Sequence, residues 1–486
     1  MKKYFHQKLF FILLLSFNIQ HSTFNISYAQ SESGYNLTIK IKGLKDTVCF
    51  LANYYGEQQY VKETSQKNVK GGKYIFSGKD TLPTGIYIIA NSKKQPLFEF
   101  IITSNEQNLI IETDTINYMG NMKIQNSIDN ILFRDYRTYL SLLQAKAQPL
   151  QTILTALNKS NPKSDSVELI SKKITKINTD FKEYRNKIIK ENPTTFFATI
   201  LKVQSDVEVP EIPVLSNGRK DSTFAFRYTK THFFDDLNLS DVRLLRTPFY
   251  QSKLNYYFTY LVPSEPDSAI KESDRIIEKS RGTRETFQYV VIYIFNKYNK
   301  SKAMGMDAVY VSLSDKYYSI GQAFWLDSAK TKEITDRAKK LSPTLIGKQA
   351  PPLHLQDTAD GWYELYKVKS KWTILYFWDS GCSHCKHATP ILLDVYHKFK
   401  DKGVEVYAVG LEFGSKDWVK YIQDKKLDWI NVSDNGRSKF ANNFRTIYDT
   451  ALTPVIFILD ENKKILAKQL DIGQVEDYLK MLLGEK

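Results

Sequence analysis

Two cysteines separated by two residues constrain this chain more than any other feature of its sequence. Cys382 and Cys385 are two of only three cysteines among 486 residues. An apolar run at 372–378 precedes them and a helical pattern begins directly after them, which predicts a strand leading through C-x-x-C into a helix. The first sulfur then lies at a helix N-terminus, where unpaired N–H groups and the helix dipole favour a thiolate. The second sulfur lies on the same helix face. The spacing therefore predicts a pair that makes and breaks one disulfide.

The N-terminus has the pattern of an export signal. Several lysines precede the apolar run 9–17, and small residues follow at 27–29, at the spacing that signal peptidase recognises. We therefore expect residues 1–30 to be a cleaved signal peptide and the mature protein to be soluble and periplasmic. No later stretch approaches the roughly 18 apolar residues of a membrane-spanning helix, so no membrane span is expected after signal removal. In that oxidising compartment, three cysteines are too few for a framework of structural disulfides, which favours a redox-active pair.

The charge distribution argues against a nucleic-acid partner. The chain has 68 Lys and Arg against 53 Asp and Glu, a net charge of +15. The basic residues are scattered and often stand beside acidic ones, whereas nucleic-acid-binding proteins usually concentrate them on one stripe. The excess therefore indicates a solvated basic surface.

Changes in hydrophobic period divide the remaining chain into three predicted domains. Residues 31–118 carry short alternating strands separated by turn signals, which predict an all-β sandwich or barrel-like domain. Residues 119–341 have apolar residues at helical spacing, which predicts an all-α domain. Strands and helices alternate in 342–486, which predicts an α/β domain with helices on both faces of its sheet. The third cysteine, Cys49, lies among apolar residues of the first domain, where we expect a buried, inert thiol.

Motifs around the cysteines resemble those of a known family. They are a G-x-x-A-P segment at 347–351, Phe377 and Trp378 before the C-x-x-C, Pro390 five residues after Cys385, and Thr453-Pro454 before an apolar strand. In this order they make residues 345–486 resemble the thioredoxin-like superfamily, and within it the TlpA-type (AhpC/TSA–TlpA) thiol–disulfide oxidoreductases. The resemblance implies a thioredoxin fold, protein thiol or disulfide clients, a redox partner in the cell envelope, and no cofactor.

The resemblance also implies roles for individual residues. Cys382 would be the nucleophile that attacks a client disulfide, and Cys385 would resolve the mixed disulfide. Thr453 and Pro454 would form a cis-proline loop that faces the client and keeps metal from the thiols. The supporting positions would be Trp378 and Pro390.

The match to the family is incomplete beside the cysteines. Gly381 stands where thioredoxins commonly have Trp, Tyr376 stands where they place a buried acid, and Ala388 stands where many TlpA-type proteins have Glu. The proton acceptor for Cys385 is therefore open between Glu412, His387 and water.

His384 lies between the two cysteines. Its side chain can hydrogen-bond the Cys382 thiolate and stabilise the reduced form, which would make the pair more oxidising. The alternative is an exposed histidine at the start of the helix without such an effect.

Metal binding, haem attachment and peroxidase activity fit these residues less well than disulfide exchange does. Cys382, His384, Cys385 and His387 are all metal-ligand types, but a second ligand pair at zinc-finger spacing is absent from the sequence, so we predict no metal site. Covalent haem attachment needs C-x-x-C-H, and residue 386 is Lys. The P-x-x-x-T-x-x-C motif of a peroxiredoxin is also missing. A metal chaperone and a cell-envelope binding protein with an accessory thioredoxin domain remain as alternatives.

The first two domains resemble regions that accompany TlpA-type proteins. The cues are the segment 72–78 in the β domain, and the segments 232–241 and 244–248 in the helical domain. Both resemble domains without assigned chemistry, and the architecture suggests an arm that binds a client or partner.

Overall fold

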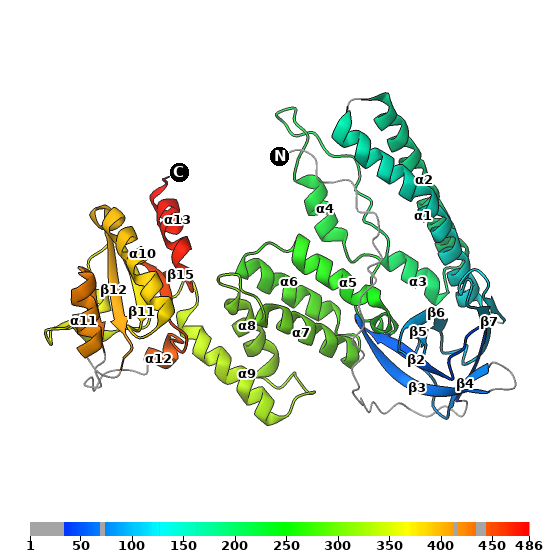
Figure 1. The fold of residues 1–486 in the computed structure, drawn as a ribbon, viewed down its shortest axis with the longest axis horizontal. Coiled ribbons are helices and arrows are strands. Elements are labelled where there is room, and N and C mark those ends of the chain that lie inside the picture. The colour runs from blue at the N-terminus through cyan, green and yellow to red at the C-terminus, as the bar shows by residue number, and fades with distance from the viewer. Residues whose placement is uncertain are drawn as a thin grey trace. The chain divides into compact units, whose positions relative to one another are not determined.

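The computed structural model describes residues 34–68, 73–125, 127–162, 164–412, 416–433 and 444–485. The predicted signal peptide at 1–30 lies outside these residues. The chain separates into two compact units, 1–261 and 262–486, which are described here one at a time (Figure 1). The boundaries of the three predicted domains stay predictions.

The first unit begins with one eight-stranded sheet in the order β6-β5-β2-β3-β4-β1-β7-β8. Along β1, Leu37, Ile39 and Ile41 are buried while the residues between them are exposed or partly exposed, because side chains alternate between the faces of a strand. Cys49 lies in the same apolar core. The all-β prediction for this region is confirmed. The strands are β1 (Tyr35–Lys42), β2 (Val48–Tyr55), β3 (Gln58–Asn68), β4 (Lys73–Gly78), β5 (Gly85–Ala90), β6 (Pro96–Ile102), β7 (Asn108–Asp114) and β8 (Lys123–Ile124).

Helices form the rest of the first unit, as the period predicted. The two longest, α1 and α2, pack through aromatic rings, with the centroids of Tyr139 and Tyr184 4.2 Å apart. A break in the helical segment follows Arg246, because Thr247 caps a new helix whose first residue is Pro248. The helices are α1 (Ile128–Ser160), α2 (Asp165–Glu191), α3 (Phe196–Val203), α4 (Phe224–His232), η1 (Val242–Arg246), α5 (Pro248–Tyr256) and η2 (Tyr257–Leu261).

The second unit opens with further helices and one buried ion pair. Lys468, whose side chain is 4% exposed, donates from Nζ to Asp307 Oδ2 at 2.5 Å. Asp307 begins α8, whereas Lys468 ends the last strand of the chain. The pair therefore ties the helices of this unit to its sheet. These helices are α6 (Pro266–Lys279), α7 (Arg284–Asn299), α8 (Asp307–Leu313), η3 (Ser314–Tyr318), α9 (Ser328–Leu341) and η4 (Ser342–Thr344).

A seven-stranded sheet completes the second unit, in the order β10-β9-β13-β12-β11-β14-β15. The interior strand β11 is parallel to β12 and antiparallel to β14. Alternate residues of β11 belong to two apolar cores, one on each face of the sheet. The predicted α/β domain with both faces of its sheet covered is therefore confirmed. The elements are β9 (His354–Gln356), β10 (Trp362–Glu364), η5 (Leu365–Lys367), β11 (Trp372–Trp378), α10 (Ser383–Phe399), η6 (Lys400–Lys402), β12 (Val404–Gly410), α11 (Lys416–Lys425), β13 (Ile430–Ser433), α12 (Phe444–Ile447), β14 (Val455–Asp460), β15 (Ile465–Lys468) and α13 (Ile472–Leu483).

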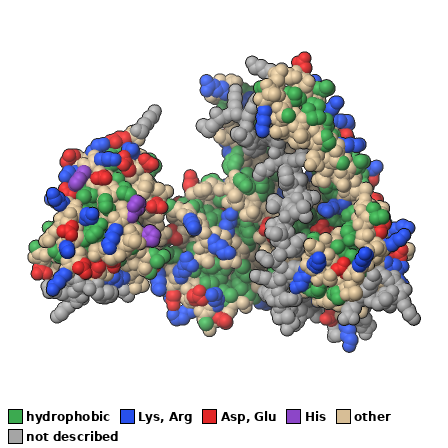
Figure 2. All heavy atoms as spheres, viewed as in Figure 1, with side chains coloured by type: hydrophobic (Ala, Val, Ile, Leu, Met, Phe, Trp, Pro, Cys, Tyr) green, Lys and Arg blue, Asp and Glu red, His purple; other side chains and the backbone are tan. Residues whose placement is uncertain are grey.

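The surface carries both signs of charge. Figure 2 shows Lys and Arg side chains interspersed with Asp and Glu on the face in view, which agrees with the scattered pattern in the sequence. Within the part of the chain that the structure describes, no helix combines the length and hydropathy needed to cross a bilayer.

Candidate active site

Cys382 lies at the junction of the interior strand β11 and the helix that follows it. β11 ends at Trp378, and Cys382 is the N-cap residue of α10, with an extended backbone at φ −74° and ψ 126°. Its carbonyl oxygen accepts the first helical hydrogen bond, from Lys386 N at 3.0 Å. The Cys382 side chain is partly exposed, while Cys385, one turn into the helix, is buried.

The loop before β14 lies against this cysteine. Phe377 of β11 pairs with Val455 of β14, so the residues just before β14 are placed beside those just after β11. The Thr453–Pro454 peptide bond is cis, and the Cys382 thiol donates to the carbonyl oxygen of Thr453 at 3.5 Å. The register of the sheet thus brings Cys382, Thr453 and Pro454 to one edge.

The two thiols have opposite pKa shifts. Burial raises the pKa of Cys382, but hydrogen bonds with the side chain of Thr453, with the backbone and thiol of Cys385 and with the backbone of His384 outweigh it, so the pKa is lowered overall. Burial dominates at Cys385 and raises its pKa to about 12. The lowered pKa favours the thiolate at Cys382, which is the reactive form of a cysteine, whereas Cys385 keeps its proton to a higher pH.

Hydroxyl groups lie in the core behind Cys385. Tyr376 and Thr389 are fully buried, and their oxygens are 2.9 Å apart. The electrostatic influence of Cys385 reaches both Tyr376 and Tyr421, whose pKa values are raised chiefly by burial. At the position where thioredoxins place a buried acid, the core of this chain therefore contains hydroxyl groups. Trp378 stacks on Tyr376 with its ring centroid 6.2 Å away.

Glu412 braces the loop that leads to Cys382. Its Oε1 accepts a hydrogen bond from the backbone N–H of Ser380, and its Oε2 is enclosed without a hydrogen-bond partner among the described residues. Sequence reasoning offered Glu412 only as a proton acceptor and missed this contact. The signal was available, because Trp378 and Gly410 pair at the ends of parallel strands, which places the residues after them side by side.

A groove adjoins the cis-proline loop. It has a volume of about 370 Å³ and is lined by Asp379, Glu412, Arg445 and Thr453, among others. On the same loop Leu452 is 84% exposed. The surface beside the partly exposed thiol therefore offers both charged and apolar contacts.

The remaining predicted residues lie apart from the reacting sulfur. The side chains of His384, His387 and Pro390 are exposed on α10, and the His384 ring makes no hydrogen bond with a described residue. A hydrogen bond from the backbone of His384 helps to lower the pKa of Cys382. Among the described residues no group of three or more His, Cys, Asp or Glu side chains is arranged to hold a metal ion.

The sheet, the thiol at the start of α10 and the neighbouring cis-proline loop place this domain in the thioredoxin class. Comparison with known proteins agrees. Residues 346–468 match the AhpC/TSA family. The thiol-disulfide oxidoreductase ResA of Bacillus cereus is 26% identical over 140 residues, which cover 28% of this chain and 78% of that protein.

Solved structures match the same part of the chain. A domain of a possible thiol-disulfide isomerase from Cytophaga hutchinsonii is 42% identical, with 29% of this chain and 96% of that one covered and a TM-score of 0.28. The thioredoxin domain of a thiol-disulfide oxidoreductase from Bacteroides vulgatus is 30% identical, with 28% and 96% covered and a TM-score of 0.26. The match of residues 346–468 to the AhpC/TSA family and the similarity to ResA support a thioredoxin-family thiol–disulfide oxidoreductase.

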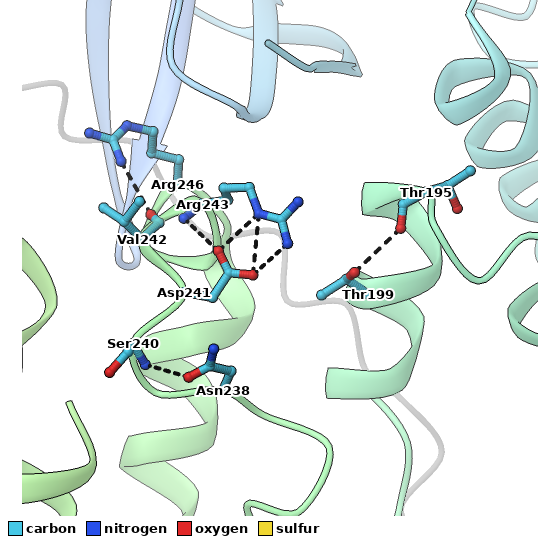
Figure 3. A network of polar contacts seen from close by, with 8 residues as sticks. All are labelled: Thr195, Thr199, Asn238, Ser240, Asp241, Val242, Arg243 and Arg246. Carbon is cyan, nitrogen blue, oxygen red and sulfur yellow. Dashed lines mark hydrogen bonds and ion pairs between the residues drawn. The ribbon is translucent and has the colours of Figure 1, made fainter. Parts of the chain in front are cut away.

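Residues 163–342 match a domain of unknown function, DUF5106. One motif of this region, singled out from the sequence, forms a polar network (Figure 3). Asp241 caps η1 and binds the Arg243 guanidinium through both of its oxygens, at 2.9 and 2.7 Å. Ser240 N donates to Asn238 Oδ1 at 3.0 Å, and Arg246 Nη1 donates to the carbonyl oxygen of Val242 at 3.2 Å. The motif therefore stabilises the local fold.

Proposed function

We propose that the protein is an exported oxidoreductase that exchanges disulfides with client proteins through Cys382 and Cys385. The observation that supports this most strongly is the contrast between the two thiols. One is partly exposed with a lowered pKa, and the other is buried with a pKa of about 12. A nucleophile that meets the client first and a protonated thiol held behind it are what the reaction needs.

In the reducing direction the reaction has two steps. The Cys382 thiolate attacks one sulfur of a client disulfide, the client S–S bond breaks, and the other client sulfur leaves and takes up a proton. Cys385 then loses its proton and attacks the Cys382 sulfur of the mixed disulfide, which releases the second client thiol. The client gains two electrons and the pair is oxidised to a disulfide. A dithiol partner in the cell envelope would reduce the pair again, and the same steps in reverse would oxidise a client.

The cis-proline loop is the proposed client site. Thr453 and Pro454 present backbone next to Cys382, and the exposed Leu452 and the adjoining groove extend this surface. Trp378 and Pro390 support the site from the core and from within α10. No hydrogen bond joins Glu412 or His387 to Cys385 among the described residues, so the proton acceptor stays open between them and water.

Export is the second part of the proposal. A signal peptide at 1–30 and a periplasmic location follow from the pattern of the N-terminal sequence. Fractionation of cells that express the tagged protein tests this, because a cytoplasmic product that keeps its first thirty residues would contradict export.

Insulin reduction tests the chemistry directly. The wild-type protein, supplied with dithiothreitol, should accelerate the precipitation of insulin B chains. Cys382→Ser and Cys385→Ser should abolish the acceleration, because each removes one sulfur of the exchanging pair. Cys49→Ala is the matched control and should keep full activity, since Cys49 is buried in the β-sheet core. Activity that survives Cys382→Ser would contradict the proposal.

A further inference from the structure

The helical part of the first unit contains a cavity that disulfide exchange does not use. It has a volume of about 410 Å³, within the range of small-molecule pockets. Its walls come from α2, the segment that follows α3, and the end of α4 with the residues after it. These elements are labelled in Figure 1 and belong to one compact unit.

Arg185 lines this cavity from α2 and is only 6% exposed. Its Nε is enclosed without a hydrogen-bond partner among the described residues. The guanidinium lies over the Phe181 ring, whose centroid is 5.8 Å away. A buried charge without a counter-ion is destabilising, because the loss of its hydration is not offset.

Arg243 in the same unit is held differently. Its guanidinium is paired with both oxygens of Asp241 (Figure 3). The fold therefore supplies a carboxylate to one arginine and leaves the other facing a cavity. This contrast indicates that the acceptor for Arg185 comes from outside the chain.

The rim of the cavity carries the opposite charge. Asp206 and Asp236 line it and are exposed, and both also interact electrostatically with the Lys253 ammonium. Asp235 is occupied by His232, whose Nδ1 lies 2.6 Å from its Oδ2. Lys202 and Glu208 add one charge of each sign.

A lysine beside the cavity holds its walls in place. Lys253 Nζ donates to the carbonyl oxygens of Ser205 and Phe233 at 3.3 and 3.4 Å. Tyr228 and His232, with ring centroids 4.1 Å apart and planes tilted by 33°, form an aromatic wall. The pocket is therefore built from side chains of several elements rather than left by a loose loop.

We propose that this cavity binds a small zwitterion of amino-acid or dipeptide size. Its carboxylate accepts hydrogen bonds from Arg185 at the base, and its ammonium group lies between Asp206 and Asp236 at the rim. A guanidinium is the side chain best suited to a carboxylate, because its N–H groups form a planar fork. The redox domain takes no part in this binding.

Isothermal titration of the full chain with glycyl-lysine tests the proposal, because this dipeptide has one carboxylate and two ammonium groups. We expect saturable binding to the wild type. Glycyl-lysinamide, which lacks the carboxylate, should bind at least about tenfold more weakly, as expected for the loss of a charge-assisted hydrogen bond. Arg185→Gln should weaken binding of glycyl-lysine to a similar extent, while Lys187→Gln, an exposed change on the same helix, should leave it unchanged.

A second variant covers the case in which Arg185→Gln does not fold. Asp236→Asn changes an exposed side chain and should weaken binding of glycyl-lysine several-fold. Acetyl-glycine, which keeps the carboxylate and has no ammonium group, should bind this variant as it binds the wild type. Equal binding of the dipeptide and its amide, or no saturable binding of either, would overturn the proposal.

Discussion

The opposite pKa shifts of the two active-site thiols predict a large difference in their alkylation rates. Cys385 has a pKa of about 12, whereas that of Cys382 lies below its ordinary value of 9.0. Three pKa units or more separate them, so at neutral pH the thiolate population of Cys382 exceeds that of Cys385 by about a thousandfold or more. A thiolate of higher pKa is intrinsically more reactive. With a Brønsted slope of about 0.5, the Cys385 thiolate has an intrinsic rate constant roughly thirtyfold larger than that of the Cys382 thiolate. Cys382 should therefore react at least about thirtyfold faster, before the burial of Cys385 is considered.

Timed alkylation of the reduced protein with iodoacetamide, followed by peptide mass spectrometry, measures both rates. Cys49→Ala provides the background, because it leaves only the two active-site thiols. The Cys382 rate should rise as the pH rises through its pKa and level off once the thiol is ionised, with a midpoint below 9.0. A midpoint at or above that value, or equal rates for the two cysteines, would refute the assignment of nucleophile and buried thiol.

Three further changes test the framework around the site. Asp307→Asn leaves the buried Lys468 ammonium without its carboxylate partner. This change should reduce the free energy of unfolding by about 3 kcal/mol, measured by chemical denaturation. A denaturation midpoint equal to that of the wild type would exclude a stabilising ion pair. Tyr376→Phe leaves the buried Thr389 hydroxyl without this partner and should cost about 1–2 kcal/mol in the same assay, whereas an unchanged midpoint would show that the hydroxyl pair is dispensable. His384→Pro should make the reduction potential more negative in glutathione buffers if the histidine stabilises the reduced pair, and an unchanged potential would leave His384 as an exposed residue without a tuning role.

Much of the redox domain was predictable because its main features follow one another directly in the sequence. The apolar run of β11, the C-x-x-C and the start of α10 are consecutive, so the position of Cys382 at a helix N-terminus follows from a short stretch of sequence. The neighbourhood of Thr453 came only from the family resemblance, because the pairing of β11 with β14 joins residues far apart in the chain.

Contacts made by long side chains could not be predicted in this way. The Tyr376 hydroxyl reaches Thr389 across the space between strand and helix, and no spacing rule connects those two positions. Arg185 is a charged residue of α2 and is nevertheless only 6% exposed in the folded chain. Burial of a charged group depends on tertiary packing, which the helical period alone does not determine.

Trapping of a mixed disulfide tests the central claim most directly. Cys385→Ser removes the resolving thiol, so the purified variant, mixed with a disulfide-bonded client such as insulin, should accumulate a covalent adduct at Cys382. Mass spectrometry should locate the client on the peptide that contains Cys382, and dithiothreitol should release it. The reciprocal Cys382→Ser variant should form little adduct, because Cys385 is buried and protonated. An adduct that forms equally well through Cys385, or no adduct with either variant, would contradict a mechanism in which Cys382 attacks and Cys385 resolves.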